Sequence, residues 1–168
     1  MHDIDEIIKE YSNHIYKYLI CLTHDYDIAE ELTQETMYKA IVNFNQLKDK
    51  DKVEMWLCKI AKNLWLQELN KRKRYTVIDN SSLEKIQMDD NIEENLIQKD
   101  DKMKLYNEIE KLDELDKQII YLRLNADLKF KEIGDIFGKT ENWARVSFYR
   151  IKQQIIKEVK KDDKKDRV

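Results

Sequence analysis

Apolar residues recur at every third or fourth position through most of this 168-residue chain. This spacing places side chains on one face of an α-helix. The pattern predicts helices at residues 4–22, 28–44, 56–74, 102–112, 114–124, 130–137 and 141–159. Between residues 75 and 101 the apolar positions are too sparse for a core, and acidic residues are frequent. The sequence therefore predicts two helical bodies separated by a polar segment.

Composition supports an all-α fold. The chain has no proline and only two glycines, and 39% of its residues are charged. Sheet proteins need more turn-forming residues than this. The length suffices for one ordinary domain or two small ones. We expect two small helical domains at residues 1–75 and 102–168, joined by a flexible acidic linker at 76–101.

The overall charge limits how the chain can bind DNA. The formal net charge is −3, and the sequence pI is about 5.7. A protein that holds duplex DNA through its total charge would be basic. Any DNA contact must therefore come from local basic patches or depend on a partner.

The predicted helix at 56–74 combines side chains that suit nucleic acid. Beside its apolar face, a second face consists of Lys59, Lys62, Asn63, Gln67 and Asn70. Trp56 and Trp65 add aromatic rings, and residues 71–74 form a basic cluster. Cations can contact phosphate, amides can bond base edges, and rings can stack on unpaired bases. Taken alone, however, the pattern favours an ordinary solvated face over a nucleic-acid surface, because basic residues at the carboxy-terminal end of a helix complement the negative end of its dipole.

Residues 130–159 have the spacing of a helix-turn-helix unit. Such a unit needs a small residue where its helices cross, a glycine that turns with positive φ, and a cap on the second helix. Gly134, Gly138 and Thr140 stand at these places. The side of the second helix that faces away from its apolar stripe carries Trp143, Arg145, Val146, Tyr149, Arg150 and Gln153. Arginines beside apolar and aromatic groups suit the major groove, with its guanine edges and thymine methyls.

The predicted helix at 28–44 has an acidic surface. Asp27, with Glu30 three residues later, predicts its cap. Glu31, Gln34 and Glu35 lie off its apolar stripe, and residue pattern alone makes them a solvated face.

Catalytic and metal-binding patterns are missing from the sequence. The three histidines are isolated, and Cys21 and Cys58 lack metal-ligand spacing. No stretch approaches the roughly 18 apolar residues of a membrane span, and the amino terminus does not resemble a signal peptide. We expect a soluble, cytoplasmic protein with reduced thiols that is not an enzyme and has no cofactor, metal or small-molecule substrate.

With both halves considered, the sequence resembles a sigma-70-family factor of the extracytoplasmic-function (ECF) type, the small class with only regions two and four. The first half carries DIAEELTQETMYKA and WLCKIAKNLWLQELNKRKR. The second carries LDELDKQIIYLRL followed by FKEIGDIFGKTENWARVSFYRIK. The order of these motifs, with the acidic segment between them, is specific to the family.

The resemblance implies a promoter-specificity subunit of bacterial RNA polymerase that acts at a dedicated stress-responsive or signal-responsive regulon. It assigns contact with core polymerase to Glu31, Gln34 and Glu35. It assigns the melted minus-ten element to Gln46, Lys48, Lys50, Lys52, Trp56, Lys59 and Asn63. It assigns the minus-thirty-five element to Thr140, Trp143, Arg145, Val146, Tyr149 and Arg150. It also implies regulation by an anti-sigma factor, which in this family is often membrane-anchored.

Two departures from the family pattern affect these assignments. Lys129 stands where the family often has a serine cap, and Val146 stands where a small polar residue is common. Two other functions also fit parts of the pattern. One is an autonomous helix-turn-helix repressor or activator whose first domain dimerises or senses a signal. The other is a helical interaction protein that does not contact DNA.

Overall fold

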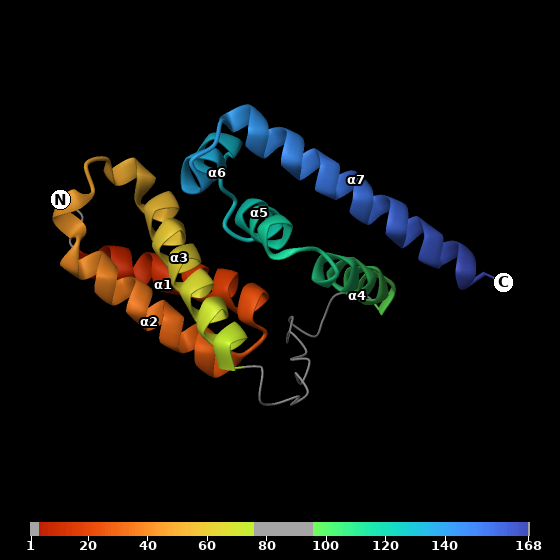
Figure 1. Ribbon diagram of the computed structural model, residues 1–168, viewed down its shortest axis with the longest axis horizontal. Coiled ribbons are helices and arrows are strands. Elements are labelled where there is room, and N and C mark those ends of the chain that lie inside the picture. Colours follow the sequence, from red (N-terminus) through yellow and green to blue (C-terminus); the bar gives the residue numbers. More distant parts are fainter. Residues whose placement is uncertain (1–3, 76–95, 168) are drawn as a thin grey trace.

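The computed structural model describes residues 4–75 and 96–167, and within them every regular element is helical. The elements in chain order are α1 (Ile4–Thr23), α2 (Tyr26–Val42), η1 (Phe44–Gln46), η2 (Lys50–Lys52), α3 (Val53–Tyr75), α4 (Leu96–Glu110), α5 (Glu114–Leu124), α6 (Phe130–Phe137) and α7 (Glu141–Lys165). The predicted all-α fold is confirmed. Figure 1 shows α1, α2 and α3 packed together on one side, with α4 to α7 on the other.

The amino-terminal half is built on the apolar faces of α1, α2 and α3. Leu19, Leu57 and Ala61 are completely buried where these helices meet. The apolar spacing predicts a buried stripe on α3 formed by Val53, Leu57, Ile60, Ala61 and Leu64, and all of these except the half-buried Ile60 are buried. On α2 it predicts that Ile41 is buried, but this side chain is exposed. Burying three amphipathic faces against one another stabilises helices that would be marginal in isolation.

The start of α2 differs from the sequence prediction. Asp25, not Asp27, is the N-cap, and its side chain accepts a hydrogen bond from Ile28 N at 3.0 Å. Asp27 lies in the first helical turn instead. The capping group therefore comes from the short His24–Asp25 connection, where His24 has a φ of 51°.

We expect Asp25→Ala to lower the free energy of unfolding by about 1 kcal/mol, since it removes the acceptor for an otherwise unpaired amide of the first turn. Asp27→Ala is the matched control and should change it by no more than roughly 0.5 kcal/mol. Urea unfolding monitored by circular dichroism measures both values. Equal losses in the two variants would contradict the assignment of the cap.

The carboxy-terminal half packs α4, α5 and α6 against the long helix α7. Ile119, Ile133 and Ile151 are fully buried at its centre. The apolar spacing predicts a buried stripe within 103–112 and another within 115–124, but Met103, Leu105, Leu115 and Leu124 are exposed. The sequence also predicts Asp113 as the cap of α5, and its side chain accepts a hydrogen bond from Asp116 N at 2.9 Å.

The linker expected at 76–101 falls mostly on residues 76–95, which lie outside the described residues. Its last part belongs to α4, because this helix begins at Leu96. The division into domains at 1–75 and 102–168 stays a prediction. The buried residues of both halves form one continuous core, with contacts between α3 and α6 and between α1 and α5.

Candidate nucleic-acid interface

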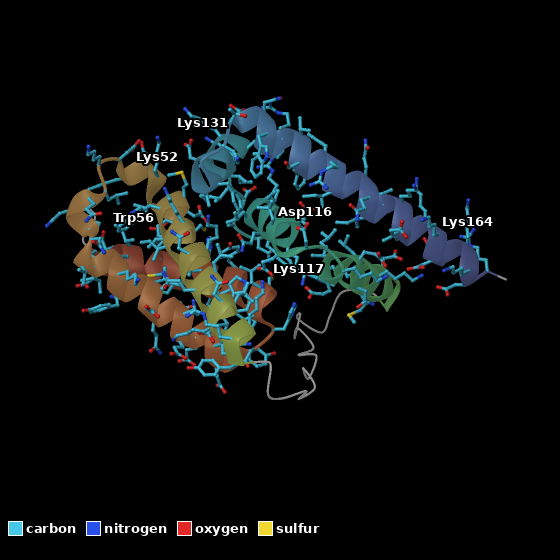
Figure 2. All side chains as sticks on the ribbon, in the orientation of Figure 1. Lys52, Trp56, Asp116, Lys117, Lys131 and Lys164 are labelled. Atoms are coloured by element: carbon cyan, nitrogen blue, oxygen red, sulfur yellow. The ribbon has the colours of Figure 1, made fainter. Side chains whose placement is uncertain are left out.

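The segment between α2 and α3 presents several cations to solvent. Gln46, Lys48, Lys50 and Lys52 are all exposed. The segment contains the two short 3-10 helices η1 and η2. Asp49 caps η2, and its side chain accepts a hydrogen bond from Asp51 N at 3.0 Å. Figure 2 shows Lys52 and Trp56 where η2 leads into α3. Lysines on an ordered loop next to an aromatic ring form a surface that can hold a phosphate backbone and stack on a base.

The surface of α3 continues this segment. Lys59 and Asn63 are exposed, and Trp56 is half-buried. These three residues are three and four positions apart, so they share one face of the helix. The face therefore offers a ring, a cation and an amide in a row.

Two residues that the sequence predicted for this surface do not belong to it. Lys62 is 8% exposed and Trp65 is 3% exposed. Lys62 Nζ donates to the carbonyl oxygen of Ile136 on α6 at 3.3 Å. Trp65 Nε1 donates to Glu114 on α5 at 2.7 Å. Both side chains contact the other half of the chain, which the spacing within α3 could not indicate.

The turn between α6 and α7 has the geometry expected of a helix-turn-helix unit. Gly138 has a φ of 65°, in the left-handed region that favours glycine. A Cβ at Gly134 would lie 2.7 Å from the carbonyl oxygen of Thr140, so only glycine permits this close approach. Thr140 caps α7 by accepting a hydrogen bond from Trp143 N at 3.1 Å. The three residue roles predicted for the turn are confirmed.

The amino-terminal part of α7 exposes most of the side chains predicted to contact DNA. Thr140, Arg145, Val146, Tyr149 and Arg150 are exposed. Trp143 is half-buried, and its ring lies 5.6 Å from that of Phe137. An exposed valine and an exposed tyrosine beside two arginines are unusual for a solvated helix and suit the major groove.

The two arginines differ in their surroundings. Arg145 Nη2 pairs with Glu141 of its own helix at 2.6 Å. Arg150 makes two hydrogen bonds to the buried carboxylate of Asp116 on α5, at 2.9 and 3.3 Å. These hydrogen bonds join α7 to α5. A contact of Arg150 with DNA would therefore compete with its bonds to Asp116, which orient α7.

The amino terminus of α6 lacks a side-chain acceptor, as the departure at Lys129 predicted. Glu132 compensates in part, because its carboxylate accepts a hydrogen bond from Lys129 N at 2.7 Å. Helix α6, which packs against α7, is therefore capped by a carboxylate of its own first turn and not by a serine hydroxyl in front of it.

The outer surface of α2 is acidic at its amino-terminal end and apolar at its carboxy-terminal end. Glu31, Gln34 and Glu35 are exposed, as predicted for a contact surface. Tyr38 is 66% exposed and Val42 is 60% exposed on the same helix. These two residues are absent from the set predicted for the contact. Tyr38 lies three, four and seven positions after Glu35, Gln34 and Glu31, and Val42 lies seven positions after Glu35. This spacing puts them on the same face of the helix and was the sequence signal that could have added them to the set.

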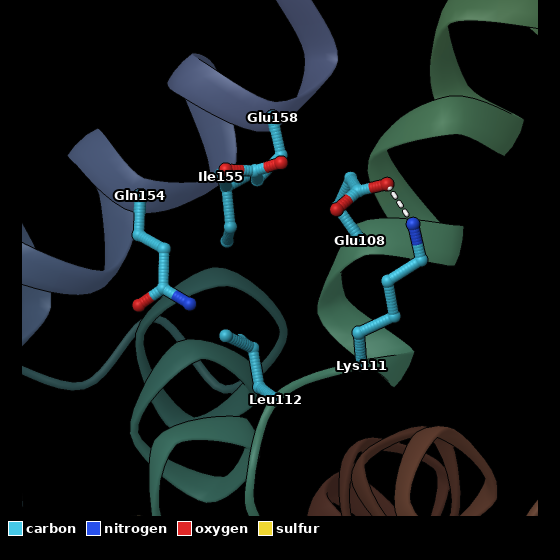
Figure 3. A pocket seen from close by; sticks show the side chains of 6 residues that line it. All are labelled: Glu108, Lys111, Leu112, Gln154, Ile155 and Glu158. Carbon is cyan, nitrogen blue, oxygen red and sulfur yellow. Dashed lines mark hydrogen bonds and ion pairs between the residues drawn. The ribbon is translucent and has the colours of Figure 1, made fainter. Parts of the chain in front are cut away.

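Metal-binding arrangements are not found in the described part of the chain. No group of three metal-binding side chains occurs among the described residues. Cys21 and Cys58 are buried and reduced, and burial raises the pKa of the Cys58 thiol well above its usual range. A hollow of about 190 Å³ lies between α4 and α7. Figure 3 shows that it is lined by side chains of mixed character, including the paired Glu108 and Lys111. It is smaller than most small-molecule sites, which measure roughly 300 to 1,000 Å³.

None of the described helices is both long enough and apolar enough to cross a bilayer.

Comparisons with known proteins identify relatives of this chain. Residues 7–75 match the family model of sigma-70 region 2. The chain is 26% identical over 152 residues to the ECF RNA polymerase sigma factor SigM of Bacillus subtilis (strain 168), covering 90% of this chain and 92% of SigM. It is also 26% identical over 159 residues to the RNA polymerase sigma factor SigV of the same organism, covering 93% of this chain and 90% of SigV.

A solved structure shares the fold. The sigma factor RpoE of Bartonella quintana, crystallised in complex with the anti-sigma factor NepR, superposes with a TM-score of 0.79 at 18% identity. The match covers 96% of this chain and 98% of RpoE.

Residues 7–75 match sigma-70 region 2, and RNA polymerase sigma factors align with 90% or more of the chain. One of these relatives, SigM, is a sigma factor of the ECF type. Members of the family are transcription regulators and not enzymes.

Proposed function

We propose that this chain is the promoter-specificity subunit of a bacterial RNA polymerase, an alternative sigma factor that directs initiation at a dedicated regulon. The observation that carries the proposal is the match of residues 7–75 to sigma-70 region 2 in a chain whose other half forms a helix-turn-helix. The protein works in the cytoplasm, where the polymerase and the promoter are, and itself catalyses no reaction.

The α3 surface and the preceding loop hold the melted minus-ten element. The lysines from 48 to 52 neutralise phosphate, Trp56 supports an unstacked base, and Lys59 and Asn63 bond its edge. Binding only the extruded base shifts the equilibrium from closed to open promoter.

The exposed face of α7 recognises the minus-thirty-five element as intact duplex. Arg145 is suited to bond a guanine edge, while Val146 and Tyr149 can contact thymine methyls or phosphate. The acidic chain has little affinity for duplex in general, so recognition depends on this surface together with the polymerase.

The acidic end of α2 binds the polymerase core through Glu31, Gln34 and Glu35. The neighbouring exposed Tyr38 and Val42 supply apolar area to the same contact. Because the RpoE of the structural match was crystallised with an anti-sigma factor, we also propose that an anti-sigma protein controls this chain by covering its polymerase-binding surfaces.

We expect Asn63→Ala to slow open-complex formation roughly tenfold while leaving polymerase binding unchanged, since the amide contacts only the extruded base. Permanganate reactivity of minus-ten thymines measures opening, and gel filtration measures binding. Asn107→Ala, which removes an exposed amide on α4, is the control. Unchanged opening in the Asn63 variant would remove that residue from the site.

In vitro transcription tests the proposed function as a whole. Core polymerase with this chain and fragmented genomic DNA of its host should start transcription at a set of sites that share two sequence elements. The autonomous helix-turn-helix alternative predicts tight duplex binding by a dimer without polymerase. A monomer that fails to associate with core polymerase while folded would refute the proposal.

A further inference from the structure

Helix α7 is longer than a helix-turn-helix unit needs. It spans 25 residues, which is about 37 Å at 1.5 Å per residue. The side chains predicted to contact the minus-thirty-five element end at Arg150, so residues 151–165 extend the helix well beyond them. The proposed function gives this extension no role.

Four lysines of the extension continue the recognition face of α7. We refer to them as the lysine stripe: Lys157, Lys160, Lys161 and Lys164. All four are exposed. Positions 146, 150, 153, 157, 160 and 164 follow one another at intervals of three or four, so their side chains share one face of the helix. The stripe is therefore continuous with the face that carries Val146 and Arg150.

Acidic residues of the same extension lie on another side of α7, against α4. Lys104 Nζ of α4 lies 2.8 Å from Asp163 Oδ1 and 3.1 Å from Asp166 Oδ2. Glu158 lines the hollow between α4 and α7, and it pairs with Lys161 at 2.8 Å. The two signs of charge are thus separated around the helix, with the acids on the side of α4 and the lysine stripe on the side of the recognition face.

Three members of the stripe keep their charge uncompensated. Within residues 4–75 and 96–167, Lys157, Lys160 and Lys164 form no ion pair. Figure 2 shows Lys164 near the end of α7, on the side away from α4. A row of exposed ammonium groups without carboxylate partners attracts an anionic surface.

The geometry of a recognition helix identifies that surface as DNA phosphate. The amino-terminal residues of such a helix contact base edges in the major groove, which is about 12 Å wide. At about 37 Å, α7 is longer than the groove is wide, so its later turns must leave the groove past a phosphate strand. The lysine stripe lies on the face of α7 that turns toward this strand.

We propose that the lysine stripe binds the phosphate backbone beside the minus-thirty-five element, so that α7 reads bases with its first turns and holds the flanking strand with its last. The proposal rests on the proposed function, since it requires the face at Val146 and Arg150 to bind this element. In this way a chain with a net charge of −3 presents a local positive surface to duplex DNA.

The salt dependence of promoter binding tests the stripe in the complex with core polymerase. The parent chain is compared with a triple variant, Lys157→Gln with Lys160→Gln and Lys164→Gln. Each lysine that leaves a phosphate should reduce the slope of log affinity against log salt concentration by about 1. We therefore expect the slope of the triple variant to be smaller by about 2 to 3, and its affinity at about 0.1 M salt to be at least tenfold lower. The loss should be equal for cognate and single-base variant elements, because phosphate carries no sequence information.

Neutral phosphates in the promoter locate the contact. Methylphosphonate groups, which lack the negative charge, replace the phosphates next to the minus-thirty-five element, on one side in the first probe and on the other side in the second. One of the two probes should bind the parent complex at least about fivefold more weakly than unmodified promoter. The triple variant should not distinguish this probe from unmodified promoter, because the interaction is already lost.

Two further variants separate a local contact from total charge. Lys9→Gln with Lys17→Gln and Lys102→Gln removes three exposed lysines from α1 and α4. This charge-matched variant should keep the slope and the affinity of the parent chain. Arginine at all three altered positions of the stripe retains the cations and should also bind as the parent does. Circular dichroism checks that every variant keeps its helix content.

A triple variant with the salt slope of the charge-matched variant would overturn the proposal. A triple variant that is weakened equally on all three promoters, while the parent chain does not distinguish them, would also overturn it and would indicate an acidic protein surface as the partner of the stripe. Failure of the parent complex to bind any promoter would refute the proposed function, and the stripe with it.

Discussion

Gly134→Val should destabilise the helix-turn-helix unit by about 3 kcal/mol and abolish minus-thirty-five binding. The reason is steric, since a Cβ at this position would lie 2.7 Å from the carbonyl oxygen of Thr140 and 2.9 Å from that of Lys139. Backbone atoms cannot rotate away as a flexible side chain can, so α6 and α7 must move apart. Urea unfolding and duplex binding measure the two effects.

Gly138→Asn is the control for this substitution. Gly138 has a positive φ, but a Cβ added there would meet no atom within 4 Å, and asparagine tolerates the left-handed region. Its unfolding free energy should change by less than about 1 kcal/mol. If Gly134→Val unfolds at the same urea concentration as the parent chain, close packing is not the reason for this glycine.

Arg145→Ala should weaken binding to the cognate minus-thirty-five element by about 1 to 3 kcal/mol, the value of a bidentate arginine contact with guanine. The loss should be largest for one base position and small for unrelated duplexes. Stability should hardly change, because the pair with Glu141 is exposed on the helix surface. Competition binding with single-base variants of the element measures the preference.

Glu141→Gln is the matched control, since it removes the charged partner of Arg145 and retains the arginine. Its binding should be equal to or tighter than that of the parent chain, because the guanidinium is then free of its carboxylate. An Arg145→Ala variant that lost affinity equally for all sequences would show a phosphate contact in place of base recognition.

Local sequence signals locate the recognition unit well. The apolar pattern predicts helix α6 at its observed bounds, and the roles of Gly134, Gly138 and Thr140 follow from steric and capping rules that act over a few residues. The predicted end of α7 at residue 159 is too early, because the helix continues to Lys165 through charged residues without an apolar stripe.

Contacts between distant segments could not be predicted from these signals. The spacing places Lys62 on an exposed face of α3, yet its ammonium group donates to the carbonyl oxygen of Ile136, which lies 74 positions later. Helical spacing determines which side chains share a face, but not which later helix packs on it. Helical spacing likewise does not show which partner binds an exposed face, so the roles of the residues on the three predicted contact surfaces remain predictions.

The end of α2 illustrates a second limit. Hydrophobicity predicts that Ile41 is buried, but its side chain is 48% exposed beside Tyr38 and Val42. The sequence alone does not distinguish an apolar residue that belongs to the core from one that serves a partner.

The hydrogen bond between Asn125 and Cys21 gives this protein a natural chemical probe. Cys21 is completely buried, and Asn125 of the other half covers its sulfur. Because the sulfur is reached only when this contact breaks, the rate at which a thiol reagent modifies Cys21 would measure local unfolding where α1 meets the end of α5 in the unlabelled protein.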